Sequence, residues 1–251
     1  MIIERKGRGK ELDKLFRTAI KYIRDDEELH LYKMIEKHPD LLNWTMDEYR
    51  GVGLLHTACE MNKVSILDTL LLPLHANENL KVGNEEQTPL MVACNRDRTD
   101  CVSVLLGPLT RTNMNAINNK GSNALHIASQ CNSASCIPLL MDGGADVNAV
   151  NNEGFTALHV ASQYISAACI PLLIDGGADV NTVDDNGFTA LHTASHYNFL
   201  ESVLSLIVSG ADTAMVSRRG KTALDLAKKI GHTAIVDLLT KKMGNVKKKP
   251  K

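Results

Sequence analysis

Apolar positions recur along this chain with a long and nearly constant period. A leucine inside a short threonine–alanine–leucine–histidine signature, or a close variant of it, returns six times at intervals of 35, 35, 33, 33 and 33 residues. These leucines are Leu55, Leu90, Leu125, Leu158, Leu191 and Leu224. A fixed period in the thirties is typical of a solenoid, in which each supersecondary unit buries its apolar face against the next unit. The pattern therefore predicts one elongated repeat domain.

Within a repeat, the spacing of apolar and turn-forming residues predicts a turn, two short helices and a loop. In the clearest copy, residues 151–154 form a turn in which Gly154 can take a positive φ without steric cost. Thr156 is expected to cap a first helix that runs through about Ser162, and a second helix spans roughly 167–174. A Gly-Gly-Ala-Asp-Val-Asn tail ends that helix at 176–181 and recurs at 143–148 and, with drift, at 210–214.

Several departures from the pattern carry expectations of their own. Glu86 stands where other repeats have the turn glycine, so this turn is expected to differ. Ile165 replaces an asparagine between two helices, and a distorted turn is expected because isoleucine tolerates a left-handed backbone poorly. Pro138 and Pro171 are expected in the first turn of second helices that start late. The two longer intervals place inserted residues near 73–78 and 108–112.

The paired T-A-L-H and G-A-D-V-N motifs, in register over about residues 48–240, resemble the ankyrin repeat. The resemblance implies an all-α repeat solenoid: an ankyrin-type stack of about seven helix-turn-helix repeats with short β-hairpin fingers, capped at both ends. Residues 1–10 are expected to form a basic extension, 11–240 the repeat domain, and 241–251 a lysine-rich disordered tail. The N-terminal cap covers about 11–47, and repeats start near 48, 83, 118, 151, 184 and 217.

Charge and composition narrow the location of the protein. The net charge is −1, so no global field favours nucleic acid, and no run approaches the roughly 18 apolar residues that span a bilayer. The first residues lack the apolar core of a signal peptide, so a cytoplasmic and/or nuclear location is expected. The lysines of residues 241–251 are compatible with a nuclear-import signal, a phosphate contact or a solvated tail.

The cysteines and histidines follow the repeat register, which favours structural roles over catalysis. Cys101, Cys136 and Cys169 occupy one equivalent position in successive second helices, and such positions lie about 8–10 Å apart. A zinc ion needs its sulfur ligands at about 2.3 Å, so these cysteines are not expected to hold a metal. No other cofactor is expected. His56, His126, His159 and His192 each end a signature and form a string rather than a cluster. With no catalytic motif, a non-enzymatic protein is expected, and only Cys131 is a candidate for reactivity.

The rare aromatic residues mark a candidate binding surface. Phe155 and Phe188 follow the turn glycine of adjacent repeats, and Tyr164 and Tyr197 stand at the end of the first helix of the same repeats. The ankyrin resemblance places all four on the concave groove, where exposed aromatic side chains are typical binding anchors. The alternative is that the phenyl rings only brace the fingers. Further candidates are Tyr49 on an earlier finger, a polar rim of Asn152, Glu153, Gln163, Asp185, Asn186 and His196, and a basic end formed by Arg218, Arg219 and Lys221.

The resemblance implies a non-catalytic protein–protein interaction module, a scaffold, adaptor or inhibitor that binds a partner protein along the concave groove. The chain is expected to be monomeric by itself, and neither nucleic acid nor membrane is an expected direct partner. Two alternatives remain: an inhibitor of a transcription factor, and a small-ligand sensor whose groove aromatics stack on a nucleotide base. The family also implies asparaginyl hydroxylation, for which Asn148 and Asn181 match the context.

Overall fold

The computed structural model describes residues 2–45 and 52–246, and this part of the chain forms fourteen α-helices, one 3-10 helix and no strand. Its residues divide into two compact units, 1–124 and 125–251. Unit 1 contains α1 (Ile2–Arg24), α2 (Glu28–Lys37), η1 (Pro39–Asn43), α3 (Leu54–Glu60), α4 (Val64–Leu71), α5 (Pro89–Asn95) and α6 (Thr99–Leu105). Unit 2 contains α7 (Ala124–Gln130), which begins at the boundary, α8 (Cys136–Asp142), α9 (Ala157–Gln163), α10 (Cys169–Asp175), α11 (Ala190–His196), α12 (Leu200–Val208), α13 (Ala223–Ile230) and α14 (Thr233–Val246).

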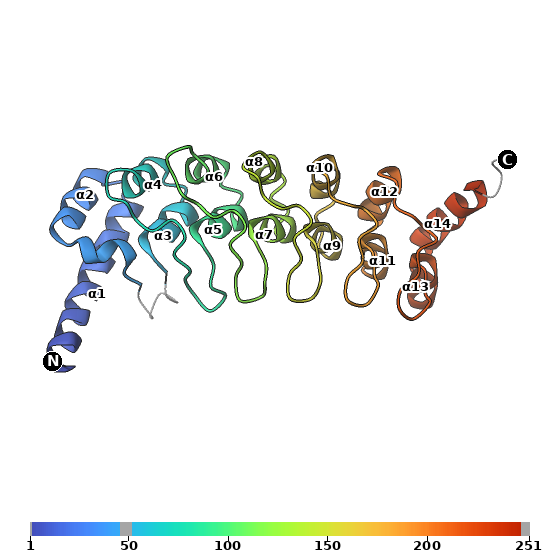
Figure 1. Cartoon of the computed structure of the whole chain (residues 1–251), viewed down its shortest axis with the longest axis horizontal. Coiled ribbons are helices and arrows are strands. Elements are labelled where there is room, and N and C mark those ends of the chain that lie inside the picture. Colours follow the sequence, from blue (N-terminus) through green and yellow to red (C-terminus); the bar gives the residue numbers. More distant parts are fainter. Residues whose placement is uncertain (1, 46–51, 247–251) are drawn as a thin grey trace. The chain divides into compact units, whose positions relative to one another are not determined.

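Each unit is built from helix pairs stacked in two layers (Figure 1). In unit 1, α3 packs against α5 in one layer and α4 against α6 in the other, while α1 and α2 cover α3 and α4. In unit 2, α9, α11 and α13 form the inner layer, and α10, α12 and α14 lie in the outer layer. Two helices of 7–9 residues could not bury an apolar face alone, so the stacking of pairs supplies the core.

The signature leucines and the apolar residues of the second helices fill the space between the layers. Five of the six signature leucines are at most 3% exposed, and Leu224 is the exception. Ile170 and Leu173 of α10, and Val203 and Leu206 of α12, are fully buried. In unit 1, Phe16 and Ile23 bury one face of α1 against its neighbours. No helix in the described part of the chain is long and apolar enough to cross a bilayer.

Threonines start the inner helices, as predicted for Thr156. The Thr156 and Thr189 hydroxyls accept from the backbone N–H groups of His159 and His192, and the histidine side chains bond back to the threonines. In α13, Thr222 makes the same reciprocal cap with Asp225. These caps satisfy donors that the first turn of a short helix leaves without a partner.

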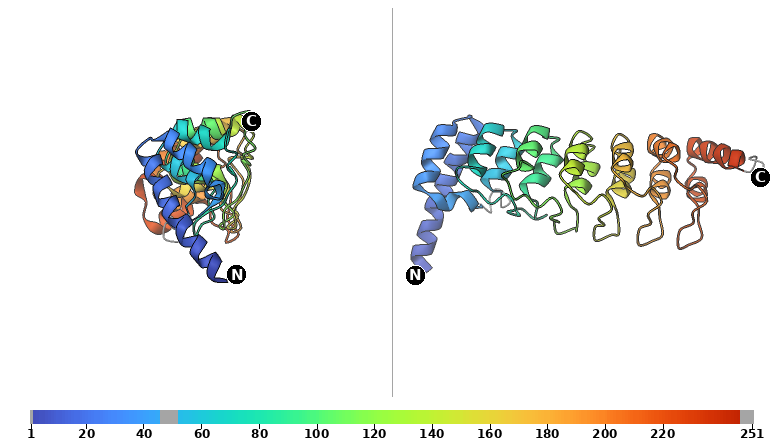
Figure 2. Two further views of the ribbon diagram at one scale, coloured as in Figure 1. Left: turned by 90° about the vertical axis from the view of Figure 1, so that its left-hand side faces the viewer. Right: turned by 45° about the horizontal axis from the view of Figure 1, so that its top comes forward.

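The connections between repeats of unit 2 turn beyond the inner helices as narrow fingers (Figure 2). Each finger is closed by a backbone bond across the turn, such as Asn151 N–H to Phe155 O at 3.0 Å and Asp184 N–H to Phe188 O at 2.8 Å. The described fingers are therefore tight turns rather than the two-stranded hairpins expected from the sequence. The single β-bridge in the described residues joins Val82 and Gln87.

Two of the predicted departures agree with the structure. The turn at Glu86 differs from the others, because a β-bridge joins Val82 and Gln87 across it, where the later fingers have one N–H to O bond such as that from Asn151 to Phe155. The φ of 55° at Glu86 still lies in the same left-handed region as the φ of 74° at Gly154. Two reciprocal bonds of 2.9 Å between Val82 and Gln87 close the turn and offset a backbone cost of about 1–2 kcal/mol. The distorted turn at Ile165 is confirmed, because Tyr164 is extended and the Ser166 N–H bonds to its carbonyl at 2.8 Å. Asn132 and Asn198 hold the left-handed conformation at the matching places.

The starts of α8 and α10 agree with the sequence-based boundaries, whereas the two ends of the chain differ from them. Pro138 and Pro171 stand third in α8 and α10, which confirms the late helix starts. The helix α1 begins at Ile2, so residues 2–10 continue a cap helix instead of forming a separate extension. At the other end, α14 reaches Val246 and includes part of the segment expected to be a disordered tail. The start of the repeat near residue 48 and the lysines of 247–251 lie outside the described residues.

Candidate functional site

The signature histidines form a relay that links each repeat to the next finger. The Nε2 atoms of His126, His159 and His192 lie 2.8, 2.9 and 3.0 Å from the carbonyl oxygens of Phe155, Phe188 and Lys221. For His159 and His192, Nδ1 accepts from the backbone N–H of the capping threonine, so Nε2 carries the proton and donates it. Burial lowers the pKa of all three, which keeps the rings neutral. These imidazoles therefore have a structural role.

His56 of unit 1 has the same position but lacks the bond from a capping threonine. Its Nε2 lies 3.1 Å from the Gln87 carbonyl, while its buried Nδ1 has no partner in the described residues. The cause is local, because the N-cap of α3 is Gly53, which has no side chain to bond the ring. Burial lowers the pKa of His56 from 6.5 to about 4.

Gly53→Thr is expected to stabilise the chain by about 1 kcal/mol, because it supplies both the missing cap and a partner for His56. A Cβ at residue 53 would lie 3.2 Å from His56 Nδ1 and 3.4 Å from the nearest Leu80 carbon, so a small shift accommodates it. Urea unfolding measures the gain. Gly53→Ala is the matched control, since it adds the Cβ without the hydroxyl. If the alanine variant gained as much as the threonine variant, the cap explanation would be wrong.

The cysteines are distributed as their register predicted. Cys59, Cys94, Cys101, Cys136 and Cys169 are buried, and Cys131 is exposed. The Cys101 thiol donates to Asn62 Oδ1 at 3.5 Å and the Cys169 thiol to Asn132 Oδ1 at 3.8 Å, so each pins the turn of the preceding repeat. Burial raises the pKa of Cys59. A search of the described residues finds no cluster of side chains that could hold a metal ion.

The two finger phenylalanines brace the relay and also line a cavity. The Phe155 ring stacks on His159 at 5.9 Å between centroids, and the Phe188 ring stacks on His192 at 5.4 Å. Both phenylalanines are half-buried. Their remaining surface borders a cavity of about 160 Å³ that also meets Gln163, His196 and Tyr197. Each phenyl ring therefore braces a finger by stacking on a histidine and also has a face beside an open cavity.

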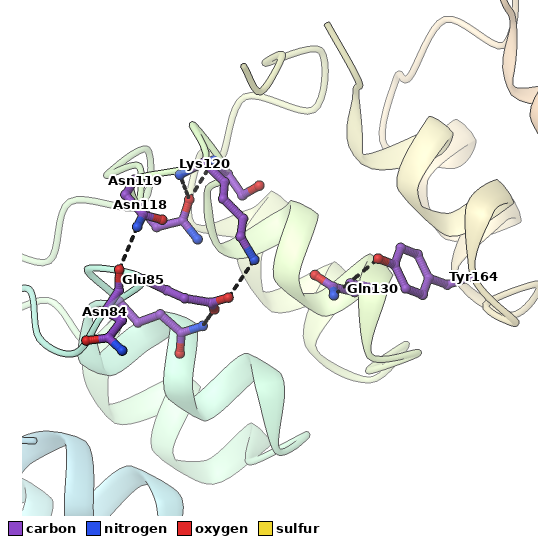
Figure 3. A network of polar contacts seen from close by, with 9 residues as sticks. Asn84, Glu85, Asn118, Asn119, Lys120, Gln130 and Tyr164 are labelled. Carbon is purple, nitrogen blue, oxygen red and sulfur yellow. Dashed lines mark hydrogen bonds and ion pairs between the residues drawn. The ribbon is translucent and has the colours of Figure 1, made fainter. Parts of the chain in front are cut away.

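Two tyrosines continue this surface along the inner helices. Tyr164 and Tyr197 are 39% and 44% exposed. Their hydroxyl oxygens accept from the Gln130 and Gln163 side-chain amides at 3.4 and 3.2 Å, and Figure 3 shows the first of these bonds. Tyr197 also stacks on Phe199 at 6.2 Å and meets His196 edge-on at 5.0 Å. These contacts hold large exposed rings in fixed positions.

Four members of the polar rim are exposed at the finger tips, namely Asn152, Glu153, Asp185 and Asn186, while Gln163 and His196 are the last residues of α9 and α11. The turns that carry these exposed residues are held by Asn151 and Asp184, which were not among the site residues predicted from the sequence. Asn151 Oδ1 accepts from the backbone N–H groups of residues 153 and 155, and Asp184 Oδ1 accepts from those of 186 and 188, at 2.8–3.0 Å. An asparagine or aspartate at the first turn position was the available signal.

Unit 1 contains a second network at its finger tips, which the sequence analysis missed (Figure 3). Lys120 Nζ lies 2.5 Å from Glu85 Oε1, and the Gln87 amide donates to Glu85 Oε2 at 2.9 Å. Asn119 Nδ2 donates to the Asn84 carbonyl at 2.6 Å. The hydrogen bond from Lys120 is the main cause of the lowered pKa of Glu85. Opposite charges at one register position, 35 residues apart, were the signal for this pair.

The remaining candidates lie in different places. Arg218, Arg219 and Lys221 are exposed on the last finger, and the latter two border a cavity of about 620 Å³. Asn148 and Asn181 bridge successive loops, because their Oδ1 atoms accept from the N–H groups of Asp179 at 3.3 Å and Asp212 at 2.8 Å. Their hydroxylation stays a prediction. Tyr49 lies outside the described residues.

Comparison with known proteins identifies the repeat. A family model described as ankyrin repeats (3 copies) matches five overlapping segments, residues 29–111, 55–151, 108–184, 132–217 and 166–250. No curated protein matches the chain significantly. The five segments cover residues 29–250, which is most of the chain and includes every helix from α3 to α14. The chain belongs to the ankyrin-repeat family, whose members are generally protein–protein interaction modules.

Proposed function

We propose that this protein is a non-catalytic interaction module that binds a partner protein along the inner-helix surface of unit 2. The surface consists of Phe155, Tyr164, Phe188 and Tyr197, with Gln163 and His196 between the rings. We refer to it as the aromatic surface. The role is that of a scaffold, adaptor or inhibitor, and the same surface serves each of them.

The observation that carries the proposal is the fixed exposure of the two tyrosines. A tyrosine ring has a large contact area and few rotatable bonds, so holding it in place before binding reduces the entropy lost in a complex. Gln130 and Gln163 fix Tyr164 and Tyr197 through their hydroxyl groups. Rings that served only the core would be buried, whereas these are 39% and 44% exposed.

Replacing Phe155 and Tyr197 together with alanine is expected to abolish capture of the partner. Interface anchors of this type contribute about 2 kcal/mol or more each, so the double variant should weaken binding at least about a thousandfold. The test is affinity capture with the wild-type chain as bait, followed by mass spectrometry and repetition with the variant.

The matched control is Leu109→Ala, which removes an apolar side chain that is 74% exposed in a loop of unit 1. Circular dichroism and thermal melting must show that both variants fold. Partners that are retained by the Phe155→Ala/Tyr197→Ala variant at wild-type levels would sink the proposal.

The nucleotide-sensor alternative receives less support from the geometry. One face of each phenyl ring is already stacked on a histidine, and the cavity that borders both Phe155 and Phe188 is about 160 Å³, while the cavity of about 620 Å³ meets only Phe188 among the four aromatic residues. Ligand pockets are usually about 300–1,000 Å³. A role as an inhibitor of a transcription factor is a special case of the proposal, and partner identification would reveal it.

A further inference from the structure

Within each unit, polar bridges join successive inner helices. Each bridge links the fifth residue after one signature leucine with the sixth residue after the next signature leucine. In unit 1 this pair is Glu60 and Arg96, whose side chains meet at 2.7 Å. In unit 2 the pairs are Gln130 with Tyr164 at 3.4 Å and Gln163 with Tyr197 at 3.2 Å.

The series stops at the last pair, where the same two positions hold His196 and Ile230. The isoleucine side chain has no polar atom, so this side-chain bridge cannot form, and the last repeat instead contacts His196 through His232 Nε2, which lies 3.0 Å from the His196 carbonyl oxygen. Ile230 is 44% exposed, and the open space between the two residues is a cavity of about 620 Å³. Its apolar lining is provided by Phe188, Leu226 and Ile230.

The rest of this cavity is basic. Arg219, Lys221, Lys228 and Lys229 line it, and in the described part of the chain none of the four makes an ion pair within 4.0 Å. The one carboxylate in the lining, Asp225, bonds to the N–H and hydroxyl of Thr222 at 3.0 and 2.9 Å. The cavity therefore combines an apolar wall with four cations that form no ion pair within 4.0 Å in the described residues, although Lys221 and Lys228 interact electrostatically with Asp225.

Two of these positive charges stand at repeat positions that hold uncharged residues in the two preceding repeats. Lys221 stands where the two preceding repeats have Phe155 and Phe188, and Lys229 stands where they have Gln163 and His196. A terminal repeat needs polar residues on its outer side. These lysines instead share a cavity with Phe188 and His196 of the preceding repeat, so a need for solubility does not explain them.

We propose that this cavity receives an acidic segment of the partner protein, with one large apolar side chain inserted against Phe188, Leu226 and Ile230. Carboxylates on either side of that side chain pair with Arg219, Lys221, Lys228 and Lys229. The inference rests on the proposed function and adds the chemistry of the partner. Glu153 and Asp185 on the earlier fingers repel acidic residues, so the acidic stretch is confined to the last repeat and the charges fix the direction of the segment.

The test is an unbiased selection of peptides from a displayed random-sequence library on the full chain. The expected enriched peptides contain two or more aspartate or glutamate residues around a leucine, isoleucine, methionine or aromatic residue. Their affinity is then measured by fluorescence anisotropy. Arg219→Glu/Lys229→Glu is expected to weaken them at least about tenfold, and raising the salt concentration should weaken binding to the wild type.

The control is Lys241→Glu/Lys242→Glu, which changes the net charge by the same amount at exposed positions of α14 outside the cavity lining. This variant should bind within about twofold of the wild type, since distant exposed charges are screened. Enriched peptides that are neutral or basic, acidic peptides that bind both variants equally, or no enrichment at all would overturn the inference. Peptides that require Phe155 and Tyr197 but tolerate Arg219→Glu/Lys229→Glu would overturn it and leave the proposed function standing.

Discussion

Lowering the pH from about 7.5 to about 4.5 is expected to reduce the free energy of unfolding by about 2.5 kcal/mol through His56 alone. Burial lowers the pKa of this imidazole from 6.5 to about 4, mainly because the ring is removed from water. His126, His159 and His192 are shifted in the same direction by burial and add to the loss. The protein should therefore be acid-sensitive well before its carboxylates are protonated.

The direction follows from where the proton binds. Below pH 6.5 the unfolded chain protonates His56 while the folded chain does not, so protons favour the unfolded state. The stability is fully present above pH 6.5, falls as the pH drops toward 4, and then levels off for this residue. A protonated Nδ1 would also need an acceptor, and this atom has no hydrogen-bond partner in the described residues.

Urea unfolding at a series of pH values measures this loss. His56→Gln removes the titration, so its curve of stability against pH should be flatter by about 2.5 kcal/mol over the same range. His38→Gln is the control, because it removes an exposed imidazole and leaves His56 in place. Equal slopes for His56→Gln and the parent chain would show that burial of His56 is not the cause.

Leu158→Ala is expected to lower the free energy of unfolding by about 3 kcal/mol. The side chain is 2% exposed in α9, which packs against α10 and α11. Two methyl groups and a methine lose their contacts, and neighbouring helices of 7 residues can close little of the space that remains. The loss should appear as a lower urea midpoint.

The matched control is Val208→Ala in α12. Val208 is 85% exposed, so the substitution should change stability by no more than about 0.5 kcal/mol. A cost below about 1 kcal/mol for Leu158→Ala would mean that the space between the helix layers is less tightly packed than the structure indicates.

The repeat register could be predicted from the sequence because it is carried by residues whose types satisfy a local requirement. Thr156 caps a helix, Pro138 stands in a first turn, and the buried cysteines occupy small apolar positions, each for reasons that depend on a few neighbouring residues. Glu86 shows the limit of such local rules. Its left-handed backbone is disfavoured for the residue alone, and the cross-turn bonds between Val82 and Gln87 reverse the preference.

The positions of the candidate residues within the repeats could be predicted from the sequence, but their contacts could not. Sequence spacing placed Phe155 and Tyr164 in one repeat, yet it could not show that the phenyl ring stacks on His159 while the tyrosine is tied to Gln130. Such pairings depend on side-chain rotamers and on the distance between repeats. The same reason explains why the pairing of Glu85 with Lys120 was missed.

The histidine relay also gives unit 2 a defined response to mechanical force. His126, His159 and His192 each hold one finger of the following repeat, while Asp225, at the next position, bonds only within its own repeat. The last repeat is therefore attached from one side. Pulling from the C-terminal side should peel one repeat at a time, each step breaking one such bond and releasing 33 residues, or about 110 Å of extended chain. A partner bound to the last repeat would oppose the first step.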